Sequence, residues 1–206
     1  TFTNKAAAEM AGRVEQLVPR ARVWLGTFHR FAAQFLRRHG RHVGLQSNFT
    51  IYDKEDSLRG LRRVIAEAGV DLMNHTPDAV AAAISWAKNA FIQPHEYNPR
   101  TGSPMGAIVQ RVYPLYQRWL NRSNAVDFDD LWLNTAIVLQ RNPELRRDLD
   151  ARHRYVMVDE YQDTNLVQYA IARALSIDHP NLAVTGDPDQ SIYGWRGADL
   201  NNILEF

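Results

Sequence analysis

The amino-acid sequence predicts an α/β fold in which a helical subdomain interrupts a parallel sheet domain. Short apolar runs alternate with helical patterns at both ends of the chain, as in βα units joined by right-handed crossovers. Between these ends, residues 49–123 show helical patterns almost throughout. The stretch from His29 to Asp159 is also far longer than a usual βα connection. We therefore expect a discontinuous sheet domain, formed by residues 1–48 and 124–206, with residues 49–123 as the insertion.

The N-terminal part contributes two strands and two helices to this plan. Residues 1–3 are expected to end one strand, and residues 23–25 are expected to form another. Residues 6–18 and 28–39 repeat apolar side chains every three or four positions. This is the spacing of an amphipathic helix, so both segments are predicted to be helical.

The inserted region is predicted to consist of helices joined by loops. Asp53 can cap one helix, and Thr76 and Ser103 each precede a proline at the first helical position. The apolar residues that follow Ser103 form a single stripe, which indicates an amphipathic helix. Residues 91–102 are polar and contain prolines, which favours a loop.

The C-terminal part returns to an alternation of helices and strands, as the α/β plan requires. Its apolar runs are short, and each ends abruptly in polar residues. In chain order we expect a helix at 127–139, a helix at 143–149, a buried strand at 155–158, a helix at 165–175 capped by Thr164, and a strand at 182–185.

The composition narrows the classes of function. The 206 residues contain no cysteine, which excludes disulfides and thiolate metal sites and favours the cytosol. We expect a cytoplasmic protein without a membrane partner, because no apolar run is long enough to cross a bilayer. The start of the chain also lacks the plan of a signal peptide. The formal net charge is only +1, so a polyanion would have to bind to a local patch.

Acidic residues follow the first of the two C-terminal apolar runs. Asp159 and Glu160 come directly after the predicted strand, and a buried parallel strand delivers its carboxyl end to a ligand crevice. An acid pair at such an edge can hold Mg²⁺ and activate a water molecule beside a nucleotide phosphate. A purely structural turn has the same pattern, so the pair alone leaves both interpretations open.

The second polar block, residues 184–199, adds groups that can contact phosphate and bases. Gln190 and Arg196 have the chemistry to bind a phosphate. They could equally serve a turn and a surface ion pair. Tyr193 and Trp195 could stack on the bases of a single strand or pack into the core.

Together these blocks resemble the motor core of superfamily 1 DNA helicases of the UvrD/Rep/PcrA group. The similarity follows the order of the family's motifs from the start of the chain to its end, and the set is far more specific than any single run. The matching runs are Thr-Phe-Thr-Asn-Lys-Ala-Ala at residues 1–7, Gly-Thr-Phe-His at 26–29, Asp-Phe-Asp-Asp-Leu at 127–131, Asp-Glu-Tyr-Gln-Asp at 159–163, and Gly-Asp-Pro-Asp-Gln-Ser-Ile-Tyr-Gly-Trp-Arg-Gly-Ala at 186–198.

The resemblance implies a partial RecA-like sheet domain of the P-loop NTPase fold. It also implies an ATP-dependent helicase that moves 3′ to 5′ on single-stranded DNA and meets duplex junctions, in DNA repair or replication restart. ATP and Mg²⁺ are the implied cofactors. Asp159 would hold Mg²⁺ and nucleotide, Glu160 would act on the attacking water, and the remaining roles fall on two further sets. The γ-phosphate and catalysis would involve Gln190 and Arg196, and DNA would be contacted by Phe2, Asn4, Thr27, His29, Tyr193 and Trp195.

Two parts of the family pattern are missing from this sequence. No Gly-x-x-x-x-Gly-Lys-Thr loop occurs, although in the family it lies just before the first matching run. The family's second motor domain would follow residue 206. We therefore expect an internal fragment of a helicase that does not hydrolyse ATP by itself.

Other interpretations stay open. The chain can be a non-catalytic fragment that binds DNA or protein, or the helicase part of a helicase-nuclease of the RecB/AddA type. A metal-dependent nuclease commonly needs a lysine beside its acids, and Lys5, Lys54 and Lys88 are all distant in sequence. The basic cluster from Arg30 to His42 is either a phosphate-binding edge or a solvated face.

Overall fold

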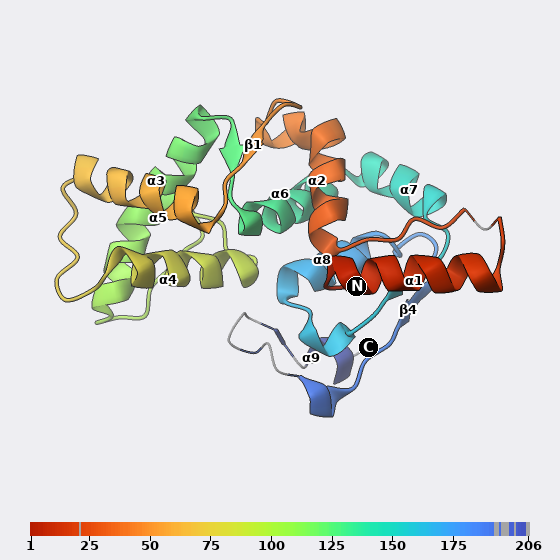
Figure 1. Cartoon of the computed structure of the whole chain (residues 1–206). Coiled ribbons are helices and arrows are strands. Elements are labelled where there is room, and N and C mark those ends of the chain that lie inside the picture. Colours follow the sequence, from red (N-terminus) through yellow and green to blue (C-terminus); the bar gives the residue numbers. More distant parts are fainter. Residues whose placement is uncertain (21, 192–193, 195–197, 200, 205–206) are drawn as a thin grey trace.

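The computed structural model describes residues 1–20, 22–191, 194, 198–199 and 201–204. Most of this chain is helical, and its strands are short (Figure 1). The helices are α1 (Asn4–Leu17), α2 (Phe28–His39), α3 (Lys54–Glu67), α4 (Pro77–Asn89), α5 (Pro104–Arg122), α6 (Phe128–Arg141), α7 (Pro143–Arg152), α8 (Leu166–Ala174) and α9 (Asn201–Leu204). The strands are β1 (Thr50–Ile51), β2 (Ala125–Val126), β3 (Val156–Val158) and β4 (Leu182–Val184), and short 3₁₀ helices are η1 (Gly40–Val43), η2 (Tyr161–Asp163) and η3 (Pro188–Gln190).

The strands form two small parallel sheets within the described residues. β1 pairs with β2, with Thr50 opposite Ala125, and β3 pairs with β4, with Val156 opposite Leu182. Parallel pairing needs a long crossover connection, which the helices between the paired strands supply. The predicted α/β class is therefore confirmed, whereas the RecA-like assignment stays a prediction.

The β1–β2 pair lies between α2 and the helices α3, α4 and α5, which are at the left of Figure 1. β1 precedes α3 and β2 follows α5, so one parallel pair brings the two ends of the insertion together. The helices between them bury their own apolar core. Gly60 on α3 lies so close to Trp119 on α5 that a Cβ at residue 60 would be 2.2 Å from the indole ring. The division into a discontinuous sheet domain and an inserted subdomain of residues 49–123 stays a prediction.

A second core lies between α2, α6 and α8. Leu36, Val126, Leu139 and Val167 are at most 1% exposed within it. α6 begins here with a reciprocal cap: the Asp130 N–H donates to the Asp127 carboxylate (2.9 Å), and the Asp127 N–H donates back to Asp130 (3.4 Å). A third, smaller core of Val158, Tyr161 and Ala172 packs against Leu182 and Val184 of β4.

Both strands predicted near the N-terminus are wrong. Residues 1–3 lead directly into α1, whose N-cap is Thr3, and residues 23–25 belong to none of the strands of the described chain. A strand needs a neighbour that satisfies its backbone groups. Val23 and Trp24 instead lie 56% and 43% exposed. The prediction failed because three apolar residues alone do not distinguish a paired strand from an extended connection.

The start of α8 also differs from the prediction. Asn165, and not Thr164, is the N-cap, since its side chain accepts the N–H of Gln168 (2.9 Å) and the Gln168 side chain accepts the N–H of Asn165 (3.0 Å). The Thr164 hydroxyl instead donates to the carbonyl of Tyr161 (2.7 Å). Thr164 and Asn165 both have side chains that can cap a helix, so the sequence did not decide between them. Asn165 is the cap because it forms a reciprocal pair of hydrogen bonds with Gln168.

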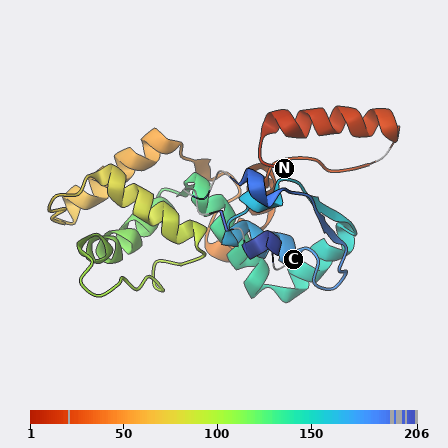
Figure 2. The same cartoon turned by 90° about the horizontal axis from the view of Figure 1, so that it is seen from below.

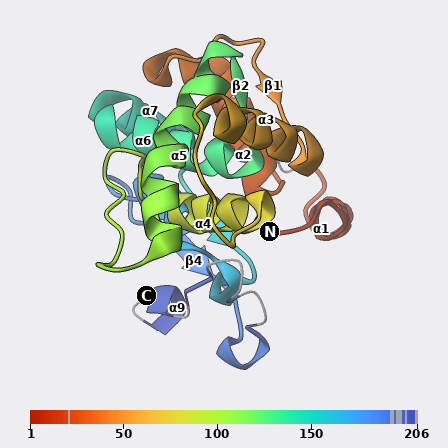
Figure 3. The ribbon, with the colours of Figure 1, turned by 90° about the vertical axis from the view of Figure 1, so that its left-hand side faces the viewer.

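Helix α1 stands apart from the other helices, as Figures 2 and 3 show from two directions. Ala7 is its buried residue, whereas Leu17 is 80% exposed. On β3, Met157 is 75% exposed as well.

In the described part of the chain, no helix combines the length and apolar character needed to cross a membrane.

Candidate nucleotide site and nucleic-acid interface

The acidic segment (residues 159–165) begins where β3 ends, beside the end of β4. The Thr185 hydroxyl, just after β4, donates to Asp159 Oδ1 (2.9 Å). The backbone keeps the two strand ends together, because the Thr185 N–H donates to the Val158 carbonyl (2.9 Å) and the Tyr161 N–H donates to the Thr185 carbonyl (2.9 Å). The predicted acid is therefore held at the carboxyl edge of a parallel sheet, where ligand crevices form.

Glu160 occupies an unusual backbone conformation. Its φ and ψ are 55° and 42°, in the left-handed region. For a residue other than glycine this conformation costs about 1–2 kcal/mol, and such outliers concentrate at functional sites. The bend at Glu160 turns the chain from β3 into η2, while the side chain stays exposed.

Gln162 is a residue of this site that the sequence did not reveal. Its side chain is 1% exposed. Its Nε2 donates to Glu160 Oε2 (2.7 Å), and its Oε1 accepts the N–H of Asp187 (3.1 Å). Gly186 leaves room for this contact, because a Cβ there would lie 2.3 Å from Gln162 Oε1. One buried amide thus ties the Glu160 carboxylate to the turn that follows β4.

Gln190 lies in that same turn, at the end of η3. Its Nε2 donates to Asp187 Oδ2 (2.7 Å), and the side chain is exposed. This contact suits the simple interpretation of a turn residue, so the predicted role at the phosphate stays a prediction. Tyr193, Trp195 and Arg196 lie outside the described residues.

The oxygen atoms at the sheet edge are of the type that Mg²⁺ prefers. Asp159 and Glu160 supply carboxylates, and the Thr185 hydroxyl lies beside the first of them. Within the ranges that the structure describes, no three histidine or acidic side chains come together as metal ligands. A magnesium ion here would therefore also need water and phosphate oxygens, which is usual for this ion in nucleotide sites.

An aromatic cluster joins the N-terminal ends of α2 and α6. The ring centroids of His29 and Trp132 are 4.2 Å apart, and those of His29 and Phe128 are 5.6 Å apart. Phe128 is 48% exposed. The sequence pointed to His29 alone. Phe128 and Trp132 lie four residues apart on α6, which places them on one helix face, and that spacing is the signal by which they could have been found.

The other predicted DNA contacts lie near the N-terminal end of α2. The Phe2 ring is 6.0 Å from that of Phe28, measured between centroids. Thr27 is buried and caps α2, because its hydroxyl accepts a backbone N–H of the first turn (3.2 Å). Asn4 is exposed at the start of α1. The structure thus places Phe2, Thr27 and His29 in one region, and their contact with DNA stays a prediction.

Part of the basic cluster from Arg30 to His42 is structural. The Arg37 guanidinium lies over the Phe49 ring, 3.8 Å from its centroid, and donates to the carbonyls of Ser47 (2.9 Å) and Phe49. Burial, and then the positive charge of His42, lower the pKa of His39. Arg37 therefore holds the loop after η1, and the lowered pKa favours a neutral His39.

Comparison with known proteins identifies the family to which this chain is similar. The model of the UvrD/REP helicase N-terminal domain matches residues 1–206. The chain is similar to the ATP-dependent DNA helicase PcrA of Leuconostoc citreum (44% identical over 209 residues), of Staphylococcus epidermidis (42% over 208) and of Bacillus subtilis (41% over 208). Each match covers 100% of this chain but only 28% of the relative's length. The chain therefore belongs to the UvrD/REP helicase family, as its motifs indicated.

Proposed function

We propose that this chain is part of an ATP-dependent DNA helicase that moves 3′ to 5′ along single-stranded DNA, in DNA repair or replication restart. The observation that carries the proposal is the placement of Asp159 and Glu160 at the carboxyl edge of β3, tied by Gln162 to the turn after β4. The names and identities of the relatives support it. The partners would be single-stranded DNA, duplex junctions and ATP.

Each residue of the site has a role in this proposal. Asp159 would hold Mg²⁺, which when bound neutralises phosphate charge and polarises a phosphoryl oxygen. Glu160 would accept the proton of the attacking water. Gln190 and Arg196 would contact the γ-phosphate, for which a permanently charged, forked guanidinium is well suited.

The isolated chain is a separate matter. It contains no Gly-x-x-x-x-Gly-Lys-Thr loop, and the backbone N–H groups and lysine of such a loop are what bind the β- and γ-phosphates. We propose that these 206 residues alone do not hydrolyse ATP. In isolation the chain would act as a DNA-binding segment.

Strand polarity tests the proposed function. The full-length protein would be given duplexes with a single-stranded tail at either the 3′ or the 5′ end, together with ATP and Mg²⁺. A 3′–5′ helicase separates the 3′-tailed duplex and leaves the 5′-tailed one intact. Equal separation of both, or none of either, would overturn the proposal.

Gln162→Met in the full-length protein is expected to lower kcat for ATP hydrolysis by about 10- to 100-fold, the usual loss when a partner that orients a reacting group is removed. KM for ATP should change little, because Gln162 contacts Glu160, the proposed general base, and would not contact the nucleotide. Steady-state kinetics would measure both values. Gln140→Met, on an exposed position of α6, is the matched control. An unchanged kcat would show that Gln162 does not position Glu160.

Trp195→Ala is expected to weaken binding of single-stranded DNA by about 10- to 100-fold across unrelated sequences, because each stacked base contributes about 1–3 kcal/mol. Affinity and the unfolding midpoint would be measured together in the full-length protein. Trp86→Ala, which removes a 59% exposed indole from α4, is the control. A large loss of stability with unchanged DNA affinity would identify Trp195 as a core residue.

A further inference from the structure

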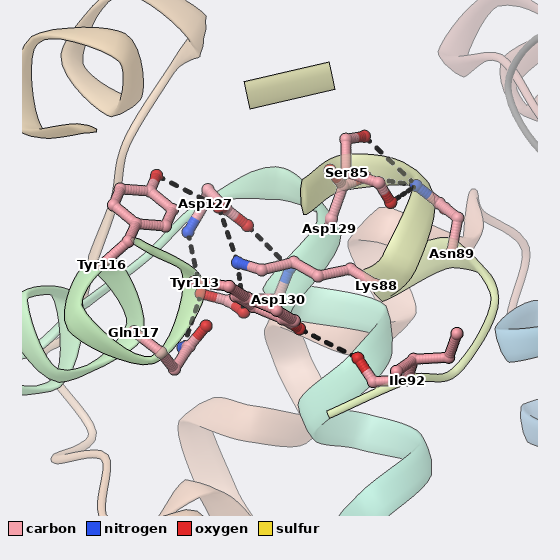
Figure 4. Close-up of polar contacts among 10 residues, drawn as sticks. All are labelled: Ser85, Lys88, Asn89, Ile92, Tyr113, Tyr116, Gln117, Asp127, Asp129 and Asp130. Carbon is pink, nitrogen blue, oxygen red and sulfur yellow. Dashed lines mark hydrogen bonds and ion pairs between the residues drawn. The ribbon is translucent and has the colours of Figure 1, made fainter. Parts of the chain in front are cut away.

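A buried polar cluster joins the inserted helices to α6 (Figure 4). The Lys88 side chain, at the C-terminal end of α4, is fully buried, and its Nζ lies 2.7 Å from both Asp127 Oδ2 and Asp130 Oδ1. Tyr116 and Gln117 of α5 donate to the same two carboxylates, at 3.2 and 3.1 Å. Three segments thus meet at one buried ion-paired centre, and none of these groups has a part in the proposed chemistry.

The next residue of α4 extends this cluster toward the acidic segment. Asn89 Nδ2 donates to Asp129 Oδ1 (3.0 Å) and to the Ser85 carbonyl (2.8 Å). Asn89 Oδ1 accepts a hydrogen bond from Asn165 Nδ2. Asn89 and Asn165 are 7% and 3% exposed. A chain of polar contacts therefore runs from α6 through α4 to the last residue of the acidic segment.

The direction of these hydrogen bonds is set by the cap of α8. Asn165 Oδ1 accepts the N–H of Gln168 (2.9 Å), so only the amide nitrogen of Asn165 remains to face Asn89. Asn89 must then present its oxygen to Asn165 and its nitrogen to the carboxylate of Asp129. Burial, and then the charge of Asp127, raise the pKa of Asp129. The hydrogen bond from the Asn89 amide opposes this shift, because it stabilises the ionised carboxylate.

Asn165 also lies where the acidic segment meets the end of the second polar block (residues 184–199). Its backbone forms an isolated antiparallel bridge with Ala198. At the preceding residue, the Thr164 carbonyl accepts the N–H of Asp199 (3.0 Å) and the amide of Asn202 (2.9 Å). Movement at this joint would reach both polar blocks at once.

We propose that Asn89 is a positioning residue, which couples the inserted helices to the acidic segment through Asn165 and so sets the placement of Glu160. The proposal rests on the proposed function for its catalytic consequence, but the coupling itself concerns only the described contacts. Lys88 anchors α4 against α6, and Asn89 transmits that anchored position to residues 159–165. The wider consequence is that the inserted helices tune turnover from outside the nucleotide site.

Reversing the polarity of the hydrogen-bond chain tests this proposal. Asn165→Asp keeps the oxygen that caps α8, because aspartate is as good an N-cap as asparagine, but it replaces the donor to Asn89 with a carboxylate. Asn89 can turn its amide toward the new acid only by presenting its oxygen to Asp129, which repels it. Asp129→Asn in the same protein removes that repulsion, so the second substitution should rescue the first.

The measurements use the full-length protein with both substitutions, singly and together. Asn165→Asp is expected to lower kcat for ATP hydrolysis by about 2- to 30-fold, the range of coupling effects, with KM for ATP little changed. Amide hydrogen exchange across residues 159–164 should become faster. The double variant should regain part of both. Asn98→Asp, at an exposed position of the connection between α4 and α5, is the matched control, and its kcat and exchange should stay close to wild type.

The outcomes separate the two proposals. If exchange at residues 159–164 is unchanged in Asn165→Asp, or if Asp129→Asn brings no recovery, Asn89 is not a positioning residue. If exchange responds and recovers as expected but the wild-type protein hydrolyses no ATP, the coupling stands and the proposed function fails. If Asn165→Asp lowers thermal stability but exchange at residues 159–164 is no faster than in the control, Asn89 has only a structural role.

Discussion

Glu160→Gln is expected to reduce DNA-stimulated ATP turnover of the full-length protein by about 10²- to 10⁴-fold, the usual loss when a general base is removed. Glutamine has the shape of glutamate, and its oxygen can still accept the hydrogen bond from Gln162 (2.7 Å), but it cannot take a proton from water at neutral pH. Binding of ATP and single-stranded DNA should persist. Phosphate release and equilibrium binding would be measured on the same preparation.

Glu144→Gln is the matched control, because this glutamate lies exposed in the first turn of α7, away from the sheet edge. It should turn over ATP at the wild-type rate. If Glu160→Gln stayed within a few-fold of wild type, another group would be the base. If it lost ATP binding together with turnover, Glu160 would act on the metal or nucleotide and not on the water.

Lys88→Met is expected to destabilise the protein by about 3–5 kcal/mol at pH 7, the usual cost of removing one partner from a buried ion pair. Burial alone would lower the pKa of Lys88, but the carboxylates of Asp127 and Asp130 outweigh it, and the pKa lies well above the ordinary 10.5. A group whose folded pKa is raised contributes its stability below its unfolded pKa. At pH 7 that contribution is fully present, and the substitution removes it.

Urea unfolding of the wild type and the variant would measure this loss. Lys54→Met, on the exposed start of α3, is the control and should change stability by less than about 0.5 kcal/mol. Burial, and then the charge of Asp127, raise the pKa of Asp130 to about 6. Without the lysine a proton can neutralise this acid, so the loss should be smaller at pH 5 than at pH 7. A loss below about 1 kcal/mol at pH 7 would contradict the prediction.

Features encoded within one short stretch of sequence were predictable. Helices α4 and α5 follow from apolar spacing and from the caps Thr76 and Ser103, and these two residues are the N-caps of α4 and α5 in the structure. Asp159 and Glu160 were predictable at the end of a strand because an abrupt change from apolar to acidic residues marks it. β1 and β2 were missed, since two residues each are too few for any period to show.

Contacts between distant residues were not predictable. Lys88 and Asp127 are 39 positions apart, and their ion pair forms only once α4 and α6 pack together. A lone lysine in a helix that is polar on one side suggests solvent, although this lysine is fully buried. The same limit applies to Gln162, whose sequence position shows that it is near Glu160 but not that its other end holds the amide of Asp187.

The left-handed backbone at Glu160 sets thermostability and turnover against each other at a single position. Glycine would adopt φ 55° without the steric cost that a Cβ brings, so the backbone favours a residue that has no carboxylate. A variant library ranked by melting temperature alone would therefore enrich glycine at residue 160 and discard the proposed base. Selection for thermal stability in this family member therefore has to exempt Glu160, where the residue with the lowest backbone strain lacks the carboxylate of the proposed base.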